Sequence, residues 1–409
     1  MQISLGAVSD VTLRARTRWH TAAGALIGAW VLVGLAVAVA YHLGGPVVWW
    51  DFIHTFTLGA VTTAIVVYST HFTEALTRTP TASYRGVTAR VVLVQVGLVG
   101  LLVDRVGYSW SLLADASCAL ILLAAAWQVA VIVTRLRRSL SGVFAVTVPF
   151  YVAAFACFIA AVALAVLAGR GIGGYTGLIA AHSRLMVWGF AWLTVLGTVV
   201  TLLPTLTGTA ISPTARARCT RSLVVHAVGL AAAAAGLIAG AELGASFGMA
   251  LVALASGMLV VAVVGSVLAQ EPGLNTASLS VLCGLGWMWA VNAADAASLA
   301  AGAFPRAITL QLLPVFLLGG LLQLVTGVLH HLLPTLRGGG PAVVRRARKA
   351  AGAGGIARLV CLNVGAALIL VGNLGGPAGT AGLILVGLAL LANVVVIATV
   401  VVTVGRKHD

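Results

Sequence analysis

Apolar runs of about 20 residues recur along the whole 409-residue chain, separated by short segments with arginine, glycine and proline. A helix of that length crosses the hydrocarbon core of a bilayer. Hydrophobic residues make up 61% of the sequence and charged residues only 8%, which is too few to cover a water-soluble protein of this size. The sequence therefore predicts an all-α, polytopic membrane protein, because a backbone in lipid must satisfy its hydrogen bonds within each span.

Hydropathy and length predict about twelve transmembrane helices in a single membrane domain, residues 1–409, with no sizeable soluble domain. No cleavable signal peptide is expected, because the segment from Met1 to Arg18 is polar. The predicted spans are 19–42, 52–76, 88–104, 110–133, 143–168, 178–204, 222–242, 246–269, 277–301, 308–334, 356–374 and 380–404.

Lysine and arginine are distributed unevenly between the two sides of this predicted topology. With the N-terminus inside, twenty of the 24 basic residues fall on cytoplasmic segments, and the four on the outer side are Arg105, Arg170, Arg184 and Arg306. The positive-inside rule then predicts a multi-pass protein of the inner (plasma) membrane with cytoplasmic N- and C-termini. The net charge of +15 is explained by this topology, with the lipid bilayer and its anionic head groups as the expected partner rather than nucleic acid.

An internal repeat relates the sixth span to the tenth. The stretches Gly189–Leu206 and Gly319–Leu336 are identical at eight of eighteen positions, including the shared "LLPTL" exit. The interval from Gly189 to Gly319 is called the repeat interval below, and the same interval counted back from Gly189 reaches Gly59 in the second span. We therefore expect three four-helix repeats, with approximate boundaries 19–133, 143–269 and 277–404.

Histidines are the informative polar residues, because an imidazole inside a membrane is costly and needs a partner. Near the outer face, His54 in the second span can pair with His182 in the sixth. Near the inner face, His71 in the second span can pair with His331 in the tenth, and His330 adjoins it so that only one of the two can face a given site. On an α-helical wheel His54 and His71 are about 260° apart, so they are expected to serve different sites.

The other polar residues of the spans are expected to have structural roles. His20, His42 and His226 lie near span ends, where imidazoles commonly bond a backbone carbonyl or reach the interface. Asp115 and Asp295 could pair with outer arginines, namely Arg105, Arg184 or Arg306. The five cysteines are scattered singly, which predicts neither a zinc site, nor a c-type haem attachment, nor a disulfide framework.

The stretches "HTFTLGAVTTAIVVYSTHF" (54–72) and "AAHSRLMVWGFAWLTVLGTVVTLLPTL" (180–206) carry a resemblance to a known fold. With twelve spans in three arcs of four, the chain resembles subunit I of the haem–copper oxidases. It is most similar to the membrane domain that precedes the catalytic part of actinobacterial multicopper oxidases, and to the haem- and copper-containing membrane proteins of the nitric-oxide response. The resemblance implies a metal centre held by histidines.

The chain departs from the oxidase pattern at the positions that form the oxygen-reducing site of an oxidase. After His182 it reads Ser183-Arg184-Leu185 in place of the Pro and Glu of an oxidase. The seventh span offers only His226, and the tenth has Leu312 at the outer position that would correspond to His182. No three-histidine copper site can be built in the familiar positions, and no blue-copper ligand set follows. A complete oxidase is therefore not expected, although whether the protein is an enzyme stays open.

The resemblance leaves a smaller role for the same scaffold. We expect an integral membrane protein that binds haem b, or else copper, through His54, His71, His182, His330 or His331, and that serves in electron transfer or in redox or ligand sensing. A redox partner or a separately encoded copper oxidase would be its protein partner. Two alternatives stay open: a transporter of metal ions or small solutes, and a non-catalytic membrane partner of a copper oxidase. The sequence does not indicate an oligomeric state.

Overall fold

A computed structural model describes residues 12–81, 83–105, 110–139, 144–337 and 340–405. These residues form helices and connecting turns, with no strand among them, and twelve helices are long and apolar enough to cross a membrane. The predicted all-helical class and the predicted number of helices that could span a membrane are thereby confirmed. The candidate spans are Arg14–His42, Trp49–Thr77, Arg85–Arg105, Leu112–Arg137, Ala145–Gly169, Tyr175–Thr207, Pro213–Ala239, Glu242–Leu268, Thr276–Ala300, Pro305–Leu336, Gly355–Gly372 and Pro377–Val400.

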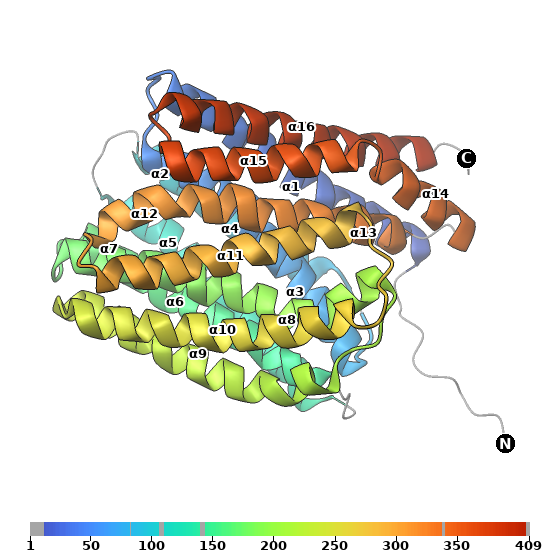
Figure 1. The fold of residues 1–409 in the computed structure, drawn as a ribbon, viewed down its shortest axis with the longest axis horizontal. Coiled ribbons are helices and arrows are strands. Elements are labelled where there is room, and N and C mark those ends of the chain that lie inside the picture. Colours follow the sequence, from blue (N-terminus) through green and yellow to red (C-terminus); the bar gives the residue numbers. More distant parts are fainter. Residues whose placement is uncertain (1–11, 82, 106–109, 140–143, 338–339, 406–409) are drawn as a thin grey trace.

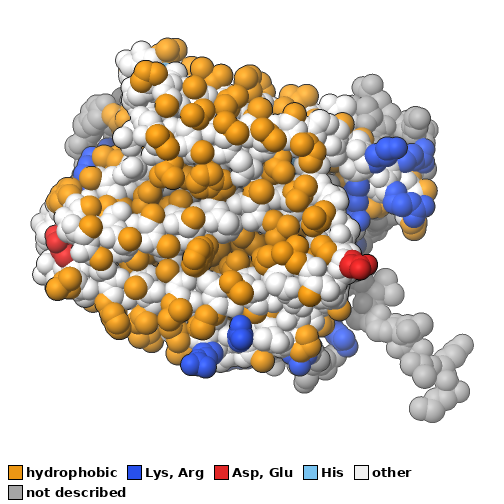
Figure 2. Space-filling model, in the orientation of Figure 1, with side chains coloured by type: hydrophobic (Ala, Val, Ile, Leu, Met, Phe, Trp, Pro, Cys, Tyr) orange, Lys and Arg blue, Asp and Glu red, His pale blue; other side chains and the backbone are white. Residues whose placement is uncertain are grey.

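The spans lie side by side in one bundle, with their axes along the longest dimension of the molecule (Figure 1). The start of α1 (Leu13–His42) and the end of α16 (Pro377–Gly405) lie at the same end, as an even number of crossings requires. The short basic helix α14 (Pro341–Ala351) lies at that end too. Hydrophobic side chains cover the middle of the visible face, whereas lysine and arginine gather mainly around α14 and along one edge (Figure 2).

Three spans, the second, sixth and tenth, form the interior of the bundle. In their most apolar 18-residue windows 89%, 83% and 94% of the residues are buried, against 22–50% in the other nine spans. Each central span consists of an N-terminal α-helix, a π-helical segment and a C-terminal α-helix. The N-terminal helices lie at the end of the bundle opposite α14, called the outer end below, and the C-terminal helices lie at the other end, called the inner end. The outer and inner helices are α2 (Trp49–His54) and α3 (Thr62–Thr77), α7 (Tyr175–Arg184) and α8 (Trp192–Thr207), and α12 (Pro305–Pro314) and α13 (Leu322–Arg337).

The π-helical segments recur at a fixed interval along the chain. They are η1 (Thr55–Val61), η3 (Leu185–Ala191) and η4 (Val315–Leu321), all of the same length. Their first residues, Thr55, Leu185 and Val315, are separated by the repeat interval that the sequence shows between Gly189 and Gly319. Single π-helical turns inside α-helices are uncommon and are frequent at functional sites.

Polar side chains bond the backbone carbonyls that the π segments expose. The Thr62 hydroxyl donates to the carbonyl of Thr57 at 2.8 Å. Nε2 of His226, in the seventh span, donates to the carbonyl of Trp188 in η3 of the sixth span at 2.9 Å. Such bonds are needed because an unpaired carbonyl inside a bilayer is costly. His226 therefore has the structural role that its position predicts.

Close helix contacts also recur at the repeat interval. A Cβ built on Gly197 of α8 would lie 2.6 Å from Cβ of Phe150, and one built on Gly327 of α13 would lie 2.6 Å from Cβ of Ser280. Phe150 and Ser280 are themselves one repeat interval apart. Glycine at these positions lets the sixth and tenth spans approach the spans that precede them in the chain.

The remaining nine spans surround the central three. Two of these nine are α1 and α16. The others are α4 (Arg85–Arg105), α5 (Leu112–Arg137), α6 (Val148–Gly169), α9 (Pro213–Ala239), α10 (Glu242–Leu268), α11 (Thr276–Ala300) and α15 (Gly355–Gly372). Consecutive members pack together from α4 to α6 and from α9 to α11, and α7 lies between α6 and α9. Helices α11, α15 and α16 continue to α1, which is joined to α4 by a 2.8 Å hydrogen bond from Trp19 Nε1 to the Thr88 hydroxyl.

Candidate haem site between the central spans

A cavity of about 420 Å³ lies in the outer half of the bundle. Its walls come from the outer helices and π segments of all three central spans and from α4, α5 and α6. The volume is within the range of small-molecule and cofactor sites. Most of the lining is aliphatic or aromatic, so the cavity suits a largely apolar ligand.

Two of the histidines predicted as ligands line this cavity and lie opposite one another. His54 is the last residue of α2 and His182 lies near the end of α7. Their ring centroids are 6.5 Å apart and their planes are inclined by 26°. The structure thus brings together the outer pair of histidines, although their separation along the chain is slightly shorter than the repeat interval.

Both imidazoles are held by the same ring nitrogen. Nδ1 of His54 lies 2.8 Å from the carbonyl oxygen of Trp50, and Nδ1 of His182 lies 2.7 Å from the carbonyl oxygen of Ala161. A carbonyl accepts only, so each Nδ1 carries the proton and donates it. Nε2 of each neutral ring then keeps a free lone pair, and histidines that bind metals are commonly oriented by such a bond from the other nitrogen.

Aromatic and cationic side chains support His54 on its other side. The indole of Trp50 stacks on the imidazole, with 4.0 Å between ring centroids and 14° between the planes. The guanidinium of Arg105, at the end of α4, lies 5.5 Å from the centre of the Trp50 ring system. This stack limits the rotation of His54 and places a positive charge near the outer end of the cavity.

The inner histidines have different surroundings. The ring of His71 lies 5.8 Å from that of His20, in an edge-to-face arrangement. Nε2 of His331 accepts a 2.8 Å hydrogen bond from the guanidinium of Arg348 in α14. His330 is buried, and its Nε2 has no hydrogen-bond partner among the described residues. For Nε2 of His331 to bind a metal shared with His71, Arg348 would have to release that nitrogen.

The described residues contain no group of three or more histidine, cysteine, aspartate or glutamate side chains placed to hold a metal ion. The outer pair instead offers two neutral nitrogen donors. Two imidazoles complete the coordination of a haem iron, because the porphyrin supplies the other four nitrogens. Two metal–nitrogen bonds of about 2 Å span about 4 Å. With Nε2 of each ring turned toward the other, the rest of the 6.5 Å between ring centroids corresponds to the radii of the two rings, so the spacing of the residues fits a haem.

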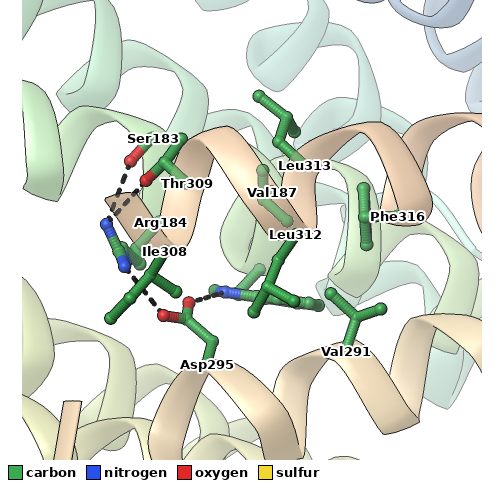
Figure 3. Close-up of a pocket in the computed structure, with 11 residues that line it drawn as sticks. Ser183, Arg184, Val187, Val291, Asp295, Ile308, Thr309, Leu312, Leu313 and Phe316 are labelled. Carbon is green, nitrogen blue, oxygen red and sulfur yellow. Dashed lines mark hydrogen bonds and ion pairs between the residues drawn. The ribbon is translucent and has the colours of Figure 1, made fainter. Parts of the chain in front are cut away.

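A buried ion pair adjoins the cavity. The guanidinium of Arg184 donates to Asp295 of α11 at 2.7 Å and to the Thr309 hydroxyl of α12 at 3.0 Å, and Nε1 of Trp188 donates to the second oxygen of Asp295 at 2.8 Å. Figure 3 shows these side chains around a small cavity of about 20 Å³. Ser183, Thr309 and three apolar residues line both this cavity and the larger one. The ion pair therefore fixes the sixth, ninth and tenth spans to one another directly beside the histidines.

The two acidic residues for which the sequence predicts ion pairs, Asp295 and Asp115, pair with different arginines. Asp295 pairs with Arg184, one of the three arginines proposed from the sequence. For Asp115 the proposed partners are wrong, because it pairs with Arg170 at the end of α6 and accepts a hydrogen bond from Trp110. Helices α5 and α6 are adjacent in the bundle and their outer ends meet, which brings Arg170 closer to Asp115 than the arginines of other spans.

Several features of the site are not among the residues that the sequence identifies as ligands. The support of His54 by Trp50 follows from a spacing of one helical turn, which places the two rings on one helix face. Arg105 and Arg306 line the cavity but are far apart in sequence. Whether an arginine is paired depends on which carboxylates lie near it in the folded chain, so the sequence does not single these two out. The π segments could have been sought around Gly59, Gly189 and Gly319, since each of these glycines is the fifth residue of its segment.

Comparison with known proteins finds no family model that matches the chain and no curated protein with significant sequence similarity.

Proposed function

We propose that the protein binds one haem b between His54 and His182, in the outer half of the membrane, and that it transfers electrons. The observation that carries this proposal is the pair of imidazoles 6.5 Å apart at an apolar cavity of about 420 Å³, each tied through Nδ1 to a backbone carbonyl. When bound, the haem would supply an iron that cycles between two oxidation states. The protein would supply both axial nitrogens and the apolar surroundings.

The use of both axial positions favours electron transfer over oxygen chemistry. An iron held by two histidines has no open coordination position for a ligand to occupy. Each Nε2 is neutral and each ring is held in one orientation. The ligand side chains would therefore move little when the charge on the iron changes. A role as a ligand sensor would require one histidine to leave, and Trp50 stacked on His54 opposes that movement at one of the two positions.

We further infer that the chain consists of three four-helix repeats and resembles haem–copper oxidase subunit I in architecture. The equal spacing of the three π segments supports this, as do the matched contacts of Gly197 with Phe150 and of Gly327 with Ser280. In this interpretation the three repeats contribute one central span each. The cavity then lies where three equivalent helices meet.

The proposed membrane orientation places α14 in the cytoplasm. Four basic residues lie within its eleven positions, and cytoplasmic segments of membrane proteins are enriched in such residues. The haem site would then lie toward the outer face of the plasma membrane. A redox partner would exchange electrons with it from that side.

The test is the optical spectrum of the protein purified in mild detergent, recorded oxidised and after dithionite reduction, with iron and copper analysis alongside. We expect a Soret band, α and β bands that sharpen on reduction, and one iron per chain. His54→Ala and His182→Ala should each abolish the low-spin spectrum, because each removes one axial nitrogen. The matched controls are His71→Ala and His331→Ala, which remove imidazoles at the inner ends of central spans and should leave the spectrum unchanged.

Three results would contradict this proposal. A colourless, metal-free preparation would reject the redox function and favour a transporter or a non-catalytic membrane partner. Copper without iron would assign the same histidines to a different metal. Loss of haem in the His71 and His331 variants, with retention in the His54 and His182 variants, would move the site to the inner end.

A further inference from the structure

Two histidines at the inner end of the bundle face one another without a hydrogen bond. The rings of His20 in α1 and His71 in α3 have centroids 5.8 Å apart and planes inclined by 83°. Neither imidazole has a hydrogen bond among the described residues. By contrast, a ring nitrogen is hydrogen-bonded in each of His54, His182, His226 and His331. The pair of His20 and His71 therefore has ring nitrogens that the folded chain leaves unused.

His20 is the more enclosed of the two. It is only 1% exposed, and its Nδ1 is a buried atom with no hydrogen-bond partner in the part of the chain that the structure describes. The rings of Trp19 and Tyr84 stand edge-to-face to it, with 4.9 and 5.6 Å between centroids, and they stack on one another at 4.4 Å. A buried polar nitrogen without a partner is costly, and a bound ion removes that cost. His20 thus lacks the carbonyl bond or interfacial position that the sequence predicts for it.

We propose that His20 and His71 bind one Cu(I) ion, as a second metal site that does not depend on a haem at the outer end. Two metal–nitrogen bonds of about 2 Å in line, together with the radii of two imidazole rings, span about 6 Å. The observed 5.8 Å between the centroids is close to this length. Rotation of a ring about its Cβ–Cγ bond turns a nitrogen toward the partner and moves the ring centre little. His71 is partly exposed and no hydrogen bond to a described residue holds it, so it can make this rotation.

The donor set favours Cu(I) over a divalent ion. Imidazole binds both copper and zinc, but a structural zinc site almost always has four ligands. The described residues place no third histidine, cysteine, aspartate or glutamate with His20 and His71. A Cu(I) ion accepts two nitrogen donors in line, so the pair is sufficient for it. The positive charge of Arg16, one helical turn before His20, acts on both imidazoles and repels a divalent ion more strongly than a monovalent one.

The experiment is an anaerobic titration of Cu(I) into the detergent-solubilised protein, in competition with bicinchoninate, a chelator whose Cu(I) complex is coloured. The double variant His54→Ala, His182→Ala is the starting protein, because it lacks the outer pair of imidazoles. We expect it, and the haem-loaded wild-type protein, to bind one Cu(I) per chain. Adding His20→Ala or His71→Ala should weaken binding at least about tenfold, since loss of a residue that merely orients a ligand already costs this much.

The matched controls are His42→Ala and His331→Ala on the same background. His42 lies at the other end of α1, and His331 lies at the inner end in another span, so both variants should keep the full affinity for Cu(I). His20→Met, which supplies a thioether ligand, should retain Cu(I) if His20→Ala folds poorly.

Three results would overturn the proposed site: no Cu(I) bound by the starting variant, Cu(I) retained after loss of His20 and of His71, or tighter binding of Zn(II) than of Cu(I) at this pair. None of them bears on the proposed function, which is tested by the haem spectra of the single His54 and His182 variants. Loss of that spectrum without loss of Cu(I) would instead affect only the outer site.

Discussion

Several buried polar residues of this protein form specific, directional bonds. His54 and His182 each bond a backbone carbonyl through Nδ1, His226 bonds a carbonyl of η3, and Arg184 bonds Asp295. Each arrangement removes the cost of an unsatisfied polar group in lipid. The same bonds orient the side chains, so that stability and the geometry of the candidate site depend on the same atoms.

The ion pair of Arg184 and Asp295 gives a prediction at this scale. Their side chains are only 2% and 6% exposed, so Asp295→Asn leaves a buried guanidinium without its counter-charge. We expect a loss of about 3–5 kcal/mol in the free energy of unfolding, measured by denaturation in mixed micelles. The double variant Arg184→Met, Asp295→Leu should recover much of this loss, because an apolar pair has no uncompensated charge.

The control for this prediction is Arg170→Gln. The pair of Arg170 with Asp115 is 38% and 32% exposed, so its removal should change stability by no more than about 1 kcal/mol. Equal effects of Asp295→Asn and Arg170→Gln would show that burial of the Arg184 pair does not matter for stability.

At the scale of secondary structure, the π segments decide how the central spans present their side chains. The wheel angle of about 260° between His54 and His71 assumes an uninterrupted α-helix, and this assumption is wrong because η1 lies between them. Hydrogen bonds of the i→i+5 type widen the helical turn, and they rotate the side chains that follow around the helix axis relative to those before the π segment. The two histidines still lie toward opposite ends of one span, so they are too far apart to bind the same ion.

Glycine at the helix contacts gives a prediction at this scale. Gly197→Ala adds a methyl group 2.6 Å from Cβ of Phe150, so the sixth span must move away from α6. We expect a loss of about 1–3 kcal/mol in unfolding free energy, as for other overpacked interiors. The control is Gly286→Ala in α11, where nothing lies within 4 Å of the added carbon, and its stability should be unchanged or slightly higher.

In the whole molecule, basic groups gather toward the ends of the bundle, and the candidate site lies near one end. The start of α1, the end of α16 and the basic helix α14 share one end (Figure 1), whereas the residues that line the cavity lie in the other half of the bundle. Apolar side chains cover the surface between the ends, as a protein surrounded by lipid requires. The orientation of the protein in the membrane therefore decides the side of the membrane toward which the cavity lies: if the basic end is cytoplasmic, the cavity lies toward the outside.

Fusions with alkaline phosphatase test this orientation, because that enzyme is active only outside the cytoplasm. A fusion after Gly171, in the turn between α6 and α7, should be active, and a fusion at the C-terminus should be inactive. A fluorescent protein at the C-terminus should give the complementary result. The opposite pattern would place α14 outside and the cavity toward the cytoplasm, contrary to the positive-inside rule.

The sequence by itself determined the helical membrane fold, the number of spans and the short list of histidines that contains His54 and His182, because these follow from local hydropathy and from the cost of polar groups in lipid. It left open which histidines meet, because the inner pair matches the repeat interval, the outer pair falls slightly short of it, and both were candidates. Only the tertiary structure decided that His54 lies opposite His182 and that Asp115 pairs with Arg170. Such contacts depend on the direction in which each side chain points around its helix axis, and the π segments change this direction. They also depend on which spans are neighbours. Neither property can be read from the composition of a single span.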